Sequence, residues 1–180
     1  MSIAAFKDLS MYKRRAEHYL GSREYLEDIP LNTCDDVFGT VIYLKIPETE
    51  DIIKASELAR SELSEMLTAK LHEYMKAGNL ELVEQVSQIL ESLKEINRLE
   101  EVFKTITVAY VLSVIRRERV NLDIDLKSSA LDLMEGIESL FLKAIPFLTD
   151  LGDLGKAVDN LRFSVEMLKA RIRKINSNGE

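Results

Sequence analysis

Helical periodicity dominates the chain from residue 49 onward. Apolar residues recur there at steps of three and four positions, the spacing that gathers side chains on one face of an α-helix. Thr49 with Glu50 and Asp51 behind it has the composition of a helix start, with Thr49 as the N-cap and acids in the first turn. Gly78 suits the left-handed residue that follows a helix end. We therefore expect a first helix over residues 49–76.

A second helix is expected from residue 80 to residue 120, because this stretch contains neither glycine nor proline. At 1.5 Å per residue it would be about 60 Å long. Joined to the first helix by a tight turn, it predicts a long antiparallel helical hairpin over residues 49–120. One side of this second helix carries the apolar positions Leu82, Val86, Ile89, Leu93, Ile96, Phe103, Ile106 and Tyr110.

Two shorter helices are expected over residues 124–145 and 150–175, separated by Pro146, which ends or kinks a helix. The last one has a strict alternation of three- and four-residue apolar steps. Such a face must be buried, either in this chain or against a neighbouring one, and the sequence leaves both open. We call it the seam and treat it as the candidate assembly surface: Leu151, Leu154, Val158, Leu161, Val165, Leu168, Ile172 and Ile175.

Residues 1–48 are predicted to form a separate, irregular N-terminal part, and residues 49–180 the helical core. Residues 4–20 can form an amphipathic helix. Residues 37–47 are β-branched and aromatic and favour a short strand. Because one strand finds no partner elsewhere in the chain, it would pair with another copy, or packing would override the local preference.

Basic residues lie beside the apolar face of the first of these elements. That composition is typical of a helix resting on anionic lipid, and equally of a plain surface helix. The candidate membrane contacts are Lys7, Lys13, Arg14 and Arg15.

Composition narrows the function classes. The 180 residues are 46% hydrophobic and carry a net charge of −7, which disfavours a dedicated nucleic-acid binder. Residues 48–103 hold 13 acids and 6 bases, whereas residues 156–175 hold 6 bases and 2 acids, so head-to-tail association is one option and solvated faces the other. A single cysteine and the lack of a 20-residue apolar stretch or signal core predict a cytoplasmic protein, and they leave peripheral attachment at a membrane open.

Sequence motifs for catalysis, cofactors or metals are missing. His18 and His72 belong to no metal-binding pattern, and neither follows a glutamate by three residues as a di-iron bundle requires. Cys34 has no CxxC partner. The remaining acidic candidates read as the solvated face of the second helix: Glu84, Glu91, Glu95, Glu100 and Glu101. We expect no catalytic, cofactor-binding or metal-ligating residues.

Two stretches resemble a known family. KAGNLELVEQVSQILESLKEINRLEEVFKTITVAYVLSVIRRERV (76–120) is similar to the hairpin of archaeal ESCRT-III (CdvB-type) cell-division proteins, and FLKAIPFLTDLGDLGKAVDNLRFSVEML (141–168) to the break before that family's last helices. The resemblance implies that the chain folds as an all-α bundle. It also implies that the chain is a short paralogue within that family. It further implies a non-enzymatic protein that self-assembles, alone or with paralogous subunits, on membrane during division.

A second interpretation is a helical subunit of a multiprotein complex, such as a GINS-like replication factor, suggested by the helix over residues 101–119. A third, a small enzyme or metal-binding bundle, is disfavoured by the missing ligand sets.

Overall fold

The computed structural model describes residues 46–115 and 122–178, and within them the side chains of residues 46–110 and 125–174. Helix accounts for 91% of the described residues, and none of them is in a strand, which confirms the predicted all-α class. The elements are α4 (Pro47–Lys76), α5 (Leu80–Ile115), α6 (Leu122–Ala144), the short 3-10 helix η4 (Ile145–Phe147) and α7 (Leu154–Asn178).

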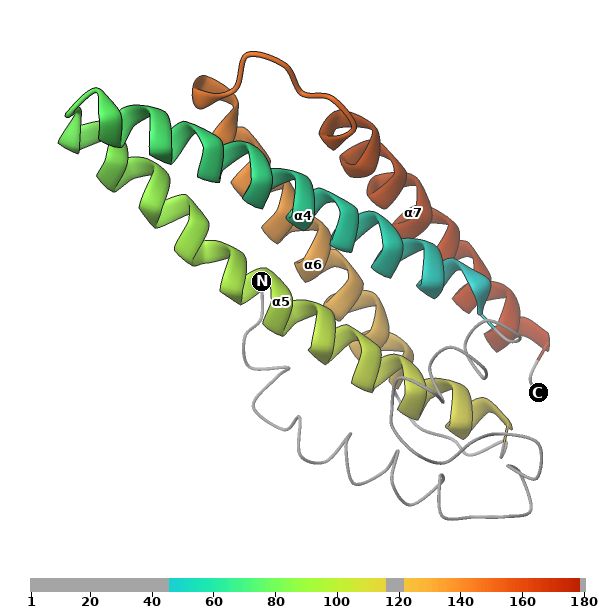
Figure 1. Ribbon diagram of the computed structural model, residues 1–180. Coiled ribbons are helices and arrows are strands. Elements are labelled where there is room, and N and C mark those ends of the chain that lie inside the picture. The colour runs from blue at the N-terminus through green and yellow to red at the C-terminus, as the bar shows by residue number, and fades with distance from the viewer. Residues whose placement is uncertain (1–45, 116–121, 179–180) are drawn as a thin grey trace, which may run out of the picture.

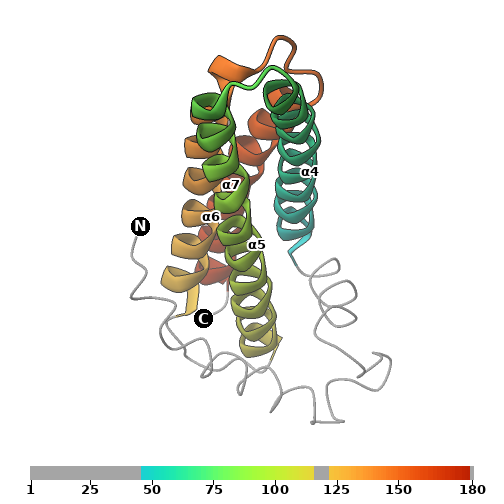
Figure 2. The same cartoon turned by 60° about the vertical axis from the view of Figure 1, so that its left-hand side comes forward.

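The four long helices form an elongated bundle (Figures 1 and 2). α4 and α5 make the predicted antiparallel hairpin. α6 returns along α5, and α7 lies along α4 while also packing on α6. The first and last described helices are therefore neighbours, although they are the furthest apart in sequence.

The hairpin turn is a Schellman motif centred on Gly78, whose φ is +72°. The Gly78 N–H donates to the carbonyl of Met75 and the Asn79 N–H donates to that of Tyr74, both at 3.1 Å. The Asn79 side chain then accepts from the Leu82 N–H at 3.3 Å and so caps α5. The predicted role of Gly78 is confirmed, because only a residue without Cβ adopts this φ at little cost.

The start of α4 differs from the prediction. The helix begins at Pro47, with Ile46 in the cap position, so Thr49 is not the N-cap. Proline is well suited to the first helical position, where its missing N–H would have no partner. The Thr49 hydroxyl instead donates back to the Ile46 carbonyl at 2.6 Å, inside the protein.

The later boundaries also shift by a few residues. α6 begins at Leu122 rather than at residue 124, and Pro146 ends it in a 3-10 turn. α7 begins at Leu154 rather than at residue 150. The predicted helix over residues 4–20, residues 37–45 of the predicted strand and the predicted end of the second helix at residues 116–120 lie outside the described residues.

The core runs the length of the bundle and is almost wholly aliphatic, with Phe103 as its largest fully buried side chain. Gly136 of α6 lies close against side chains of α5. A Cβ built there would lie 2.8 Å from Ile96 Cδ1 and 3.2 Å from Leu99 Cδ1. The absence of a side chain at Gly136 thus sets the spacing of α5 and α6 at this level.

Candidate assembly surfaces

Six seam residues pack inside this chain. α7 lies against α4 and α6, and the six side chains are fully buried. The partner that the sequence left open is therefore intramolecular for this part of the seam. They are Leu154, Val158, Leu161, Val165, Leu168 and Ile172.

The other candidates are placed differently. Leu151 precedes α7 and is 37% exposed, so this chain does not bury it with the rest of the seam. The apolar spacing continued through it, but the backbone there is not yet helical. Ile175 is part of α7, but its side chain lies outside the described ones, as do all of Lys7, Lys13, Arg14 and Arg15.

The prediction that Glu100 belongs to a solvated glutamate face is wrong. Its carboxylate is buried between α5 and α4. There it accepts from the Ser56 hydroxyl at 2.8 Å and from Arg60 through Nε at 3.0 Å and Nη2 at 3.1 Å. The hydrogen bond that Arg60 donates to Glu100 raises the pKa of Arg60. A buried carboxylate is tolerated because its oxygens are satisfied by charged and neutral donors.

Ion pairs also attach α7 to its neighbours. Arg171 donates to Glu48 through Nη2 at 2.9 Å and Nε at 3.2 Å, joining the last helix to the first turn of α4. Arg162 Nε donates to Glu138 of α6 at 2.8 Å. The hydrogen bond that each arginine donates to its partner carboxylate raises the pKa of that arginine. Both arginines are partly exposed, so these pairs set orientation more than they add stability.

The outer surface of α4 and α7 carries an apolar patch that sequence reasoning missed. Phe163 is 67% exposed, Leu58 43% and Met167 42%. We call these three residues the Phe163 face. Leu58 and Phe163 line opposite sides of a groove of about 350 Å³ between α4 and α7, whose floor includes Ala55 and Ala157. The available signal was Phe163 and Met167, one turn apart on the polar side of a cleanly amphipathic helix.

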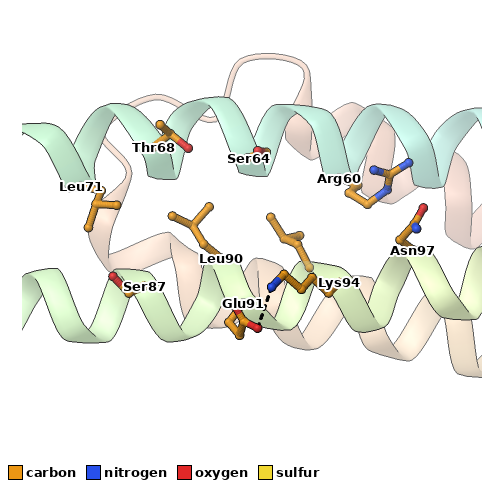
Figure 3. A pocket seen from close by; sticks show the side chains of 10 residues that line it. Arg60, Ser64, Thr68, Leu71, Ser87, Leu90, Glu91, Lys94 and Asn97 are labelled. Carbon is orange, nitrogen blue, oxygen red and sulfur yellow. Dashed lines mark hydrogen bonds and ion pairs between the residues drawn. The ribbon is translucent and has the colours of Figure 1, made fainter.

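A second groove runs along the hairpin between α4 and α5 (Figure 3). It has a volume of about 660 Å³, with Leu71 and Leu90 on its walls. Its polar side chains are spread over several turns of both helices, and the Glu91–Lys94 pair at 2.9 Å lies on one rim. Such a long open trough offers a surface to another chain rather than a set of groups converging on one reacting atom.

Asp132 on α6 is a buried acid outside these surfaces. Its Oδ2 has no hydrogen-bond partner in the described structure. Burial, with a smaller contribution from the nearby Glu135, raises the pKa of Asp132 to about 6. Asp132 is therefore a buried titrating group on α6, with Ser129 one turn before it and Glu135 one turn after it.

Within the described residues, no three histidine, cysteine, aspartate or glutamate side chains gather as a metal site would require. None of the described helices combines the length and apolar character needed to cross a bilayer.

No family model, no curated protein and no solved structure matches this chain.

Proposed function

We propose that this chain is a non-enzymatic, self-assembling helical protein that works on an anionic membrane surface, in the manner implied by its resemblance to archaeal ESCRT-III cell-division proteins. Its partners would be further copies of itself and paralogous subunits, and its work would be membrane remodelling.

The observation that carries this proposal is that α7 exposes two large apolar side chains outside its buried seam. Its seam packs against α4 and α6, whereas Phe163 and Met167 lie on the outward side of the helix. A helix that served only the bundle would expose polar residues there. Exposed aromatic and methionine side chains are enriched at protein contacts. α7 therefore has apolar surface left for a contact with another molecule.

The membrane part of the proposal is supported by sequence. Lys13, Arg14 and Arg15 stand beside apolar residues of the predicted helix over residues 4–20, a composition that suits an anionic bilayer surface. Surface attachment concentrates copies in two dimensions, so weak contacts between them would be sufficient for assembly.

Vesicle sedimentation with electron microscopy of the full chain tests the proposal. We expect the protein to sediment with phosphatidylserine-containing vesicles, to stay in solution with pure phosphatidylcholine vesicles, and to form ordered assemblies on the former. A protein that stays unbound and unassembled with both would overturn the proposal. Binding to a defined replication complex without self-assembly would favour the alternative interpretation.

A further inference from the structure

We infer that the Phe163 face is a contact between two copies of this chain related by a twofold axis, with the Phe163 ring of each copy entering the α4–α7 groove of the other. This inference rests on the proposed self-assembly and specifies one of its contacts. The contact lies on α4 and α7, on the side of the bundle away from α5 and α6.

Shape is the first argument. Phe163 stands two-thirds exposed at the edge of a groove that has Leu58 on its other side. The groove volume of about 350 Å³ is at the low end of the range that takes a small ligand, so it accommodates an aromatic side chain. One surface therefore carries both a projecting ring and a hollow for a ring. A twofold contact is the arrangement in which such a surface meets itself.

Charge is the second argument. The chain has a net charge of −7, so two copies repel at most orientations. The hairpin end, residues 62–98, carries seven acids and four bases and is a poor place for copies to meet. The groove instead has one acid and one base on its rim, Asp51 and Lys54. Lys54 pairs with Glu50 at 3.0 Å, so the charges on this rim are locally compensated and repel a second copy less than the hairpin end does.

Area sets the expected strength. About 20 residues of each helix lie on this side of the bundle. They form a strip about 30 Å long and about 20 Å wide, which is the width of two helices. That strip gives about 600 Å² per copy, somewhat below the roughly 800 Å² of a standard stable interface. The contact should therefore be weak, with a dissociation constant in the micromolar range, and should become effective where copies are concentrated.

Sedimentation equilibrium of the full chain tests the inference between about 1 µM and about 300 µM. We expect the unmodified chain to show a monomer–dimer equilibrium. Phe163→Glu should weaken it at least about tenfold, because a buried aromatic anchor is lost and a charge is introduced. Leu142→Glu is the matched control, because Leu142 on α6 is 66% exposed but lies outside the groove. It should dimerise like the unmodified chain, and circular dichroism should show all three equally helical.

Equal dimerisation of Phe163→Glu and the unmodified chain overturns this inference while leaving self-assembly through another surface intact. A chain that stays monomeric in solution but assembles on phosphatidylserine vesicles also overturns the inference alone. A chain that does neither overturns the inference and the proposed function together.

Discussion

Ser56 and Glu100, 44 positions apart in the chain, are joined by a 2.8 Å hydrogen bond in the interior between α4 and α5. Arg60, which lines the hairpin groove, donates hydrogen bonds to the same carboxylate. The network fixes the register of the hairpin, because sliding either helix by one turn would leave a buried carboxylate without donors. Aliphatic packing alone tolerates such slips far better.

Glu100→Ala should lower the free energy of unfolding by about 2–3 kcal/mol, since the Ser56 hydroxyl and part of the Arg60 guanidinium lose their buried acceptor. Urea denaturation measures this change. Glu101→Ala is the matched control. Its side chain is exposed and its ion pair with Lys104 is long, at 3.6 Å, so the change should stay within about 0.5 kcal/mol. Equal effects at the two positions would contradict the register role.

Asp132 should make stability depend on pH in a defined direction. Its pKa is about 6 in the folded protein, above the ordinary value of 3.8. Between these values the folded protein holds a proton that the unfolded chain has released, so stability falls as pH rises through about 4 to 6. Asp132→Asn should therefore stabilise the protein by about 1 kcal/mol at pH 7.5 and have little effect at pH 4. Thermal melts at both pH values decide this, and the same effect at each would refute it.

Gly78→Ala should destabilise the protein by about 1 kcal/mol, although a Cβ there would meet nothing within 4 Å. The cost is conformational, because φ is +72°. Gly155→Ala provides the opposite control. Its site is equally open and its backbone is helical, so the gain in helix preference should stabilise α7 by up to about 0.5 kcal/mol. Two changes of the same sign in chemical denaturation would rule out this explanation.

Leu161→Asp should unfold the protein or lower its stability by more than about 3 kcal/mol, because it puts a charge into the fully buried seam. Phe163→Asp, two positions away on the outward side, should change monomer stability by less than about 0.5 kcal/mol. Circular dichroism melts at low protein concentration separate the two. A similar loss from both would show that the outward side of α7 also supports the bundle.

Replacing Lys13, Arg14 and Arg15 together with glutamate should abolish binding to phosphatidylserine vesicles, since each base near such a surface contributes about 1 kcal/mol. The control replaces Lys76, Lys94 and Lys143, which makes the same change in net charge on the described helices. Vesicle sedimentation at two salt concentrations gives the result. Equal loss in both variants would point to net charge rather than to a membrane-binding helix.

The sequence predicted the elements that depend on local rules. Seam positions from Leu154 to Ile172 follow a strict three-four repeat, and burial of one such stripe is nearly obligatory. Gly78 was recognised because the backbone of a helix end has few solutions. The strict repeat was also misleading at Leu151, where the spacing continued beyond the helix.

Glu100 and the Phe163 face could not be predicted in the same way. A glutamate between Leu99 and Glu101 looks like its exposed neighbours until Ser56 and Arg60 of the other helix are placed beside it. Phe163 and Leu58 belong to helices about 100 residues apart, and only packing brings them to one groove. Single-sequence periodicity describes each helix by itself and carries no information on which helices become neighbours.

The pairing of α4 with α7 has a consequence for how the chain folds. The α4–α5 hairpin is local and can form as soon as both helices exist, whereas the Arg171–Glu48 end of the α4–α7 contact closes across 123 positions. During synthesis, the side of α4 that α7 will cover stays bare until α7 has emerged. A nascent hairpin therefore spends seconds with an open apolar flank, at synthesis rates of about 5–20 residues per second. In that interval a neighbouring nascent chain could supply the missing helix.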